Sequence, residues 1–289
     1  MTERIGTVNI RRILADKVTE ENDLVVVEEP LEIRIGYGSD SDRKQSSITV
    51  TMRTPGDDEL LCMGFLYSEG IISSLSDVLS AKYCKNIGQE PGGDNIMRVE
   101  LIPNVKVEIE KIERNFYTNS SCGVCGKASI DHVKQNSEPL KITSFKVAKE
   151  VLQKLPQKLL STQEVFRYTG GLHACGLFTP NGEMILHKED VGRHNALDKL
   201  IGSLVLSKQL PLNESILVLS GRISFELVQK AVNAGIPIVA GVGAPSTLSI
   251  DLANEYGVTL IGFLKENGFN IYTGFERVVN FETSYDVSG

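Results

Sequence analysis

The C-terminal part of this chain alternates short apolar runs with helical patterns, and that alternation narrows the possible folds more than any other feature. Runs typical of buried strands occur at Ile216–Leu219, Ile236–Ala240 and Val258–Phe263. Apolar residues at helical spacing separate these runs, over 227–232 and again over 248–256. Strands that alternate with short helices favour parallel pairing through crossover helices. The sequence therefore predicts a layered α/β fold for this part.

The N-terminal part has a different pattern, which is dominated by strands. Leu31, Ile33 and Ile35 alternate with charged residues at the two-residue period of a half-buried strand. One main helix is predicted after Thr54, which is a suitable cap and is followed by a proline where a missing N–H costs nothing. Two more strands are expected around 97–101 and 105–109.

Between these parts the hydrophobic pattern lapses from about 116 to 140. We therefore expect an N-terminal α+β domain over 1–115, a mobile loop over 116–140 and an α/β domain over 141–289. The apolar pattern of 147–155 predicts a helix early in the last domain. The turn residues Pro180-Asn181-Gly182 predict a hairpin between strands at 174–178 and 184–188.

Composition limits the class of protein. The chain has 289 residues, 41% of them apolar, and a net charge of −7, which argues against general nucleic-acid binding because such binding needs a basic surface. No stretch approaches the roughly 18 apolar residues of a membrane span, and the first residues carry no secretory apolar region. Five cysteines fit a disulfide framework poorly. We expect a cytoplasmic protein with reduced thiols.

Two of the five cysteines, Cys122 and Cys125, lie three positions apart in the run SSCGVCGK. Small neighbours leave the sulfurs reachable, and the nearby Lys127 favours the reactive thiolate. A nucleophilic or sulfur-carrying thiol is the favoured interpretation. A structural zinc site, for which His132 and Cys84 are the nearest further ligands, a redox pair and an unreactive buried pair stay open as alternatives.

Basic residues gather where anions are usually bound. Arg193, His194 and Lys199 fall at the start of a helix expected over 195–206, where backbone N–H groups favour anions. The alternative interpretation is a capped helix with solvated charges.

Three further segments follow predicted parallel strands: Ser220-Gly221-Arg222, the glycine-rich run 241–246, and Phe263-Leu264-Lys265-Glu266-Asn267-Gly268. Ligands of open α/β sheets usually bind at the carboxyl ends of the strands. The shared placement favours a phosphate-rich ligand. The guanidinium of Arg222 would form a bidentate contact with a phosphate, and residues 263–268 would close over the ligand.

Several segments together resemble the formate dehydrogenase accessory sulfurtransferase family (FdhD): SSCGVCGK, TGGLHACGLF, EDVGRHNALDKLIG, SGRISFELVQKA and GAPS. The resemblance extends from RTPGDDELLCMGFLYSEGII at 53–72 to GFLKENGFNIYTG at 262–274. It implies a carrier that takes persulfide sulfur from a cysteine desulfurase and passes it to the molybdenum cofactor used by formate dehydrogenase. It also implies a cytidine-deaminase-like second domain and a homodimer.

The resemblance further implies roles for single residues. Cys122 matches the cysteine that carries the persulfide, and Cys125 matches the second loop cysteine. Phe263–Gly268 matches the segment that binds the bis(molybdopterin guanine dinucleotide) cofactor, so a GDP-like nucleotide is a further expected ligand and no catalytic metal is expected. The family pattern has an arginine where this chain has Lys265, and lysine keeps the charge without the bidentate fork.

Two other classes of function are weighed beside the sulfurtransferase. One is a binding module, a chaperone for the cofactor or a guanine nucleotide whose cysteines only shape a loop. The other is a zinc nucleobase deaminase, which needs a His-x-Glu motif followed downstream by Pro-Cys-x-x-Cys. Here His173-Ala174-Cys175 lacks the glutamate and the cysteine pair lies upstream.

Overall fold

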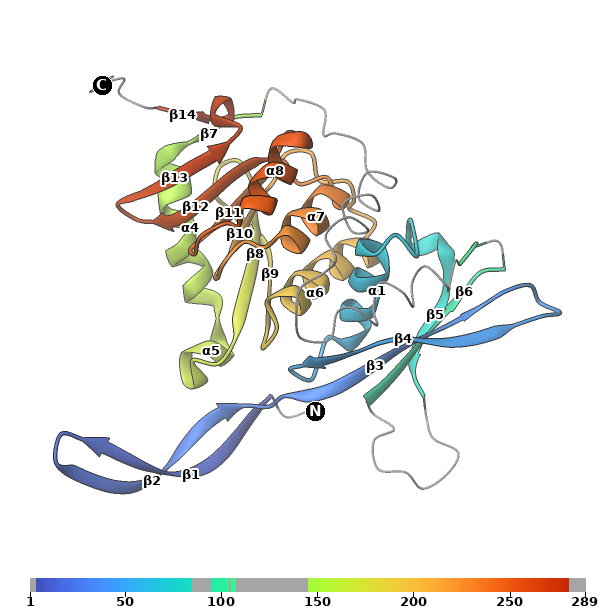
Figure 1. The fold of residues 1–289 in the computed structure, drawn as a ribbon, viewed down its shortest axis with the longest axis horizontal. Coiled ribbons are helices and arrows are strands. Elements are labelled where there is room, and N and C mark those ends of the chain that lie inside the picture. Colours follow the sequence, from blue (N-terminus) through green and yellow to red (C-terminus); the bar gives the residue numbers. More distant parts are fainter. Residues whose placement is uncertain (1–3, 85–94, 104, 108–144, 281–289) are drawn as a thin grey trace. The chain divides into compact units, whose positions relative to one another are not determined.

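The computed structural model describes residues 4–84, 95–103, 105–107 and 145–280 (Figure 1). Two compact units interleave along the chain. Unit 1 takes the described residues of Met1–Glu138 together with Gln163–Cys175 and Lys188–Leu210, and unit 2 takes the remainder from Pro139 onward. This contact-based division differs from the consecutive ranges 1–115, 116–140 and 141–289, which stay a prediction.

Unit 1 contains a four-stranded sheet in the order β4-β3-β6-β5. Its strands are β3 (Glu29–Tyr37), β4 (Lys44–Arg53), β5 (Val78–Tyr83) and β6 (Ile96–Leu101). The alternation predicted around Leu31 is confirmed, because Leu31, Ile33 and Ile35 are fully buried on one face of β3. A separate two-stranded hairpin, β1 (Ile5–Leu14) and β2 (Lys17–Val26), precedes this sheet.

The helices of unit 1 are α1 (Asp58–Ser68), α5 (Glu164–Thr169) and α6 (Arg193–Leu206), with a 3-10 turn, η1, at Leu75–Asp77. Helix α1 packs on both β6 and α6. Two glycines allow α1 and α6 to approach closely, since a Cβ at Gly64 would overlap the carbonyl of Asp198 and a Cβ at Gly202 would overlap that of Leu60.

Unit 2 is built around a six-stranded sheet in the order β13-β12-β11-β10-β8-β9. The boundary between the two units falls within strands β8 and β9, so each of these strands has residues in both units. Strands β10, β11 and β12 pair in parallel, as the alternation of strands and helices predicted, and β13 adds an antiparallel edge. The strand bounds are β8 (His173–Phe178), β9 (Met184–Asp190), β10 (Ile216–Leu219), β11 (Ile238–Gly241), β12 (Thr259–Lys265) and β13 (Gly268–Thr273).

The helices of unit 2 are α4 (Lys149–Thr162), α7 (Phe225–Asn233) and α8 (Thr247–Glu255). Both α4 and α8 pack on β12, and α7 packs on α8 (Figure 1). Strands β7 (Val147–Ala148) and β14 (Val278–Val279) form a short parallel pair, and β14 comes directly after the 3-10 turn η3 (Phe275–Arg277) in the sequence. The predicted fold class, an α+β part and a layered α/β part, is confirmed.

Several local predictions were wrong, each for a tertiary reason. Helix α1 begins at Asp58, not after Thr54, because Thr54 is buried and its N–H donates to Asp190 Oδ2 at 3.2 Å. Residues 147 and 148 form a strand with β14 instead of opening the helix. The described residues 105–107 are not in a strand, and the sequence analysis missed β5 and α5.

Candidate functional site

Cys122 and Cys125, the predicted reactive pair, lie outside the described residues. The structure describes the other three cysteines, and all of them are free thiols. Cys62 and Cys175 are fully buried, and Cys175 donates its S–H to the carbonyl of Ala196 at 3.1 Å. Burial raises the pKa of both thiols, so neither is a thiolate at neutral pH. Cys84 is half-buried.

The three strand-end segments of unit 2 lie side by side, as the sequence analysis placed them. Gly243 N–H donates to the carbonyl of Gly221 at 3.0 Å, and Phe263 N–H donates to the carbonyl of Gly243 at 3.1 Å. The packing requires glycine, because a Cβ at Gly243 would lie 2.8 Å from the backbone nitrogen of Arg222. These contacts bring Arg222 and Phe263 to one edge of the sheet; a ligand-binding role for that edge stays a prediction.

The segment Phe263–Gly268 is not a loop that follows the last strand. Strand β12 continues to Lys265 and turns at Glu266-Asn267 into β13, so the segment forms a β-hairpin with a register shift between Gly262 and Lys265. The expectation of a separate closing loop was therefore wrong, because the antiparallel partner β13 extends the strand. Leu264 is buried inside the hairpin, whereas Lys265 is exposed.

Phe263 stands out at this shift in register. Its φ angle is 54°, in the left-handed region that bulky residues rarely adopt, and the residue is 44% exposed. Unusual backbone at an exposed aromatic residue is found more often at ligand sites than elsewhere. The aromatic ring of Phe263 and the cation Arg222, on segments that both bond to Gly243, offer stacking for a base and a charge for a phosphate.

In unit 1, helix α6 begins at Arg193, two residues earlier than predicted, and Gly192 is its N-cap. Arg193 is half-buried, and its Nε has no hydrogen-bond partner in the described part of the chain. His194 is the second residue of the helix. Arg193 and His194 belong to unit 1, whereas Arg222 and 263–268 belong to unit 2.

Lys199 was expected among the phosphate-binding cations, and this expectation was wrong. Its side chain is 1% exposed, and its Nζ lies 2.7 Å from Asp190 Oδ2 and donates to the carbonyl of Thr54 at 2.8 Å. Asp190 is fully buried and accepts further hydrogen bonds from the side chain of Asn195 and the N–H of Gly192. Lys199 is therefore part of a structural ion pair.

A second buried ion pair was also missed from the sequence. Arg53 is 1% exposed and donates from Nε and Nη2 to the buried carboxylate of Asp58, with the shortest contact at 2.8 Å. Glu29 accepts a further hydrogen bond from its Nη1, and Asn95 accepts one from its Nη2. The only local signal was the charge of Arg53 at the end of a strand in which polar and apolar residues alternate.

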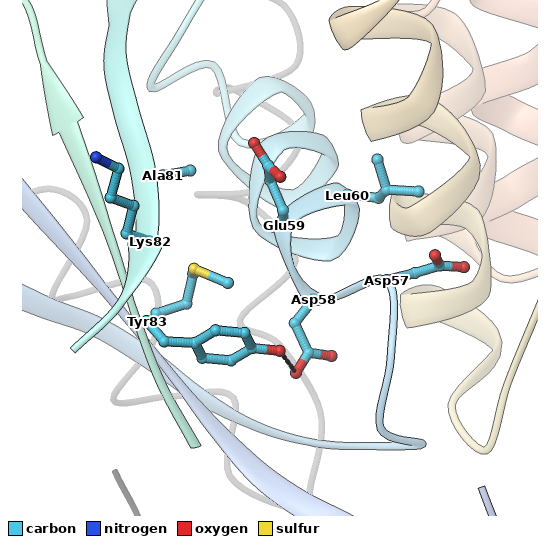
Figure 2. Close-up of a pocket in the computed structure, with 8 residues that line it drawn as sticks. Asp57, Asp58, Glu59, Leu60, Ala81, Lys82 and Tyr83 are labelled. Carbon is cyan, nitrogen blue, oxygen red and sulfur yellow. Dashed lines mark hydrogen bonds between the residues drawn. The ribbon is translucent and has the colours of Figure 1, made fainter. Parts of the chain in front are cut away.

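The structure also contains a cavity of about 720 Å³ in unit 1, between the start of α1 and strand β5 (Figure 2). Figure 2 shows Tyr83 pointing to Asp58, and Tyr83 Oη donates to Asp58 Oδ2 at 2.8 Å. Burial and this carboxylate raise the pKa of Tyr83, so the phenol stays neutral. The charges of the lining are mixed, with Asp57 and Glu59 on one wall and Lys82 on the other.

No group of three or more potential metal-ligating side chains occurs among the described residues. Within the same residues, no helix combines the length and the apolar character that crossing a membrane demands.

A two-unit α+β and α/β protein with a glycine-lined strand-end edge is the class that these features define. The model of the FdhD/NarQ family matches residues 26–279, so the chain belongs to that family. Proteins named sulfur carrier protein FdhD are similar over nearly all of it. The one from Streptomyces coelicolor is 46% identical over 96% of both chains, and the one from Sulfurisphaera tokodaii is 44% identical over 96% of this chain and all of that one.

The fold is also similar to that of a crystal structure from Desulfotalea psychrophila, which is described as a candidate formate dehydrogenase accessory protein. The TM-score is 0.73, and the match covers 96% of this chain and all of the other. With 24% sequence identity, this likeness supports the fold alone.

Proposed function

We propose that this protein is a sulfur carrier that receives persulfide sulfur from a cysteine desulfurase on Cys122 and delivers it to the molybdenum cofactor of a formate dehydrogenase. The observation that carries the proposal is the 46% identity, over 96% of the chain, with a protein named as a sulfur carrier. The proposal also includes three more specific points: the sulfur is delivered to the cofactor, it is carried as a persulfide on Cys122, and the protein is located in the cytoplasm.

The described thiols support this choice of residue. Cys62 and Cys175 are buried and their pKa values are raised, so they are poor nucleophiles. In the sequence, Cys122 and Cys125 lie among glycine and serine residues close to Lys127, which favours the thiolate. Loading needs a thiolate that attacks the outer sulfur of the donor persulfide. The donor S–S bond breaks, a new S–S bond forms at Cys122, and the desulfurase cysteine leaves as a thiolate.

Release can use the second cysteine. When the Cys125 thiolate attacks the inner sulfur of the Cys122 persulfide, a disulfide forms between the two cysteines and the outer sulfur departs as hydrosulfide with the bonding electron pair. The carried sulfur is thereby reduced and the two cysteines are oxidised. The spacing of two intervening residues suits such a disulfide.

We further propose that the strand-end edge of unit 2 holds the nucleotide part of the cofactor. Arg222 and Lys265 are exposed cations in an acidic chain, and Phe263 presents 44% of its surface for stacking with a guanine base. Arg193 belongs to unit 1, and its Nε lacks a partner in the described residues, so it is a separate candidate for an anion contact and not part of this edge. The bound cofactor is the acceptor of the sulfur.

The first test is sulfur loading of the full-length protein. After incubation with a cysteine desulfurase and cysteine, mass spectrometry is expected to show a gain of about 32 Da on the peptide that contains Cys122. Cys122→Ala should lose this gain and the ability to activate formate dehydrogenase, whereas the matched controls Cys62→Ser and Cys175→Ser should keep the gain. Full activation by Cys122→Ala would contradict the proposal.

A second measurement separates the carrier from a chaperone that only binds. Titration calorimetry with GDP should give a similar affinity for wild type and Cys122→Ala, and Arg222→Ala should weaken it by about tenfold, the loss of one charged hydrogen bond. GDP binding together with full formate dehydrogenase activation by Cys122→Ala would identify a binding module without sulfur transfer.

A further inference from the structure

Strands β12 and β13 form an antiparallel hairpin at one edge of the six-stranded sheet, and their pairing is interrupted near its turn (Figure 1). Gly262 lies opposite Asn270, and the next pair toward the turn is Lys265 opposite Gly268. Two residues of β12, the first of which is Phe263, therefore oppose a single residue of β13. Such a β-bulge re-aims side chains and occurs often beside ligand sites.

The first position of this bulge is occupied by a residue type that is unfavourable there. Phe263 has a φ angle of 54°, and a left-handed residue at the start of a bulge is normally glycine, because glycine has no Cβ to clash with the following carbonyl. Any other residue in this conformation lowers the folding equilibrium constant by roughly 5- to 30-fold. Stability alone would therefore favour glycine at this position.

The bulge also determines where the side chain of Phe263 lies. In an uninterrupted strand, side chains alternate, so Phe263 would share a face with Ile261, which is fully buried. Instead Phe263 is 44% exposed, and it is the next residue, Leu264, that is fully buried. The irregular backbone thus keeps a large aromatic side chain at the surface, at the carboxyl end of a parallel strand.

Hydrogen bonds hold the bulge to the neighbouring strand ends. The N–H of Phe263 donates to the carbonyl of Gly243 at 3.1 Å, and the N–H of Gly243 donates to the carbonyl of Gly221 at 3.0 Å. Gly221 directly precedes the exposed cation Arg222. Two backbone hydrogen bonds therefore fix the distance along the edge between the aromatic residue and the segment that carries the charge.

Close packing around Gly262 holds the strand in place immediately before the bulge. A Cβ at this glycine would lie 2.7 Å from Pro245 Cδ and 3.0 Å from Tyr272 Cε2. Pro245 belongs to the loop after β11, and Tyr272 belongs to β13. Because Gly262 is enclosed from two sides, the backbone of Phe263 is positioned by the fold before a ligand arrives.

We propose that the left-handed bulge at Phe263 is a pre-organised stacking platform for the base of a nucleotide, kept in the fold although it lowers stability. The inference rests on the nucleotide site of the proposed function and adds the role of the strained backbone. Stacking on an aromatic side chain contributes roughly 5- to 150-fold in affinity per base. A ring that is already in place loses less conformational entropy on binding than one that must be ordered.

A comparison of glycine with alanine tests the strain in the full-length protein. Phe263→Gly should have a folding equilibrium constant about fivefold above that of Phe263→Ala, because only alanine retains the Cβ that clashes in this conformation. Phe269→Gly and Phe269→Ala are the matched controls, since Phe269 lies in the same hairpin and its backbone is not left-handed. There alanine should be the more stable by about two- to fivefold. Denaturant unfolding measures all four constants, and alanine more stable than glycine at position 263 would overturn the proposal.

Titration calorimetry with GDP tests the platform itself. Phe263→Tyr retains the ring and should bind within about twofold of the wild type, whereas Phe263→Gly and Phe263→Ala should each lose about tenfold or more. The loss in Phe263→Gly is expected although this variant is the more stable of the two. GDP binding that is unaffected by loss of the ring would overturn only the platform. A wild type that does not bind GDP would overturn the proposed nucleotide site together with it.

Discussion

Two lysines of this protein have opposite environments: Lys199 lies within helix α6, and Lys265 lies at the end of strand β12. Lys199 in unit 1 is 1% exposed and is held by Asp190 at 2.7 Å. Lys265 in unit 2 is exposed at the turn of the β12–β13 hairpin. The first lysine therefore contributes to the fold, and only the second is available to a ligand.

The difference in burial distinguishes charged side chains that stabilise the fold from those that can bind a ligand. A buried ion pair such as Lys199–Asp190 is costly to break, because the remaining charge stays buried without its partner. An exposed cation contributes little to stability, since water already solvates it. Substitutions on either side should therefore change different properties of the protein.

The largest effect is expected from Lys199→Met. This change leaves the carboxylate of Asp190 buried and uncompensated, so the free energy of unfolding should fall by about 3–5 kcal/mol. The matched variant Lys265→Met should change it by less than about 0.5 kcal/mol. Denaturant unfolding monitored by circular dichroism measures both. A loss below about 1 kcal/mol for Lys199→Met would show that the pair is solvated.

A smaller effect is expected where the strand-end segments meet. Gly243→Ala places a Cβ 2.8 Å from the backbone nitrogen of Arg222, and the resulting overpacking should lower the unfolding free energy by about 1–3 kcal/mol. Gly268→Ala is the control, because nothing lies within 4 Å of a Cβ there. Equal losses in the two variants, compared by thermal unfolding, would mean that the edge is not closely packed.

The smallest effect should come from Lys265→Arg, which supplies the planar fork that lysine lacks. We expect a severalfold gain in GDP affinity, about 0.5–1 kcal/mol, without a change in unfolding free energy. Titration calorimetry measures the affinity, with Lys82→Arg in unit 1 as a control for added guanidinium charge. An unchanged affinity would remove Lys265 from the proposed phosphate contacts.

Much of the C-terminal fold could be predicted from local patterns. The apolar runs at 216–219 and 236–240 coincide with the buried parallel strands β10 and β11, although β11 begins two residues later, at Ile238, because a strand covered on both faces needs a continuous apolar run. The approximate places of α7 and α8 followed from helical spacing. The turn at Phe263–Gly268 could not be predicted in this way, since its hairpin depends on pairing with β13.

The predictions that failed depended on burial and pairing that local patterns do not specify. Thr54 has the local pattern of a helix cap, but its N–H is bound by Asp190 Oδ2, so the helix begins at Asp58 instead. The strand β5 was missed because Leu79 is 62% exposed and the expected alternation is weak. Arg53 and Asp58 could not be paired from sequence, because nothing local distinguishes a buried charge from a solvated one.

The sequence by itself determined the alternation of strands and helices and the presence of a cysteine pair in a glycine-rich run. Local spacing and side-chain chemistry are sufficient for these features. Only the tertiary structure decided which cations are free, which thiols are inert and which apolar side chains of the β1–β2 hairpin stay exposed. Burial and pairing depend on residues more than a hundred positions apart, as in the contact of Thr54 with Asp190, and no local pattern specifies them.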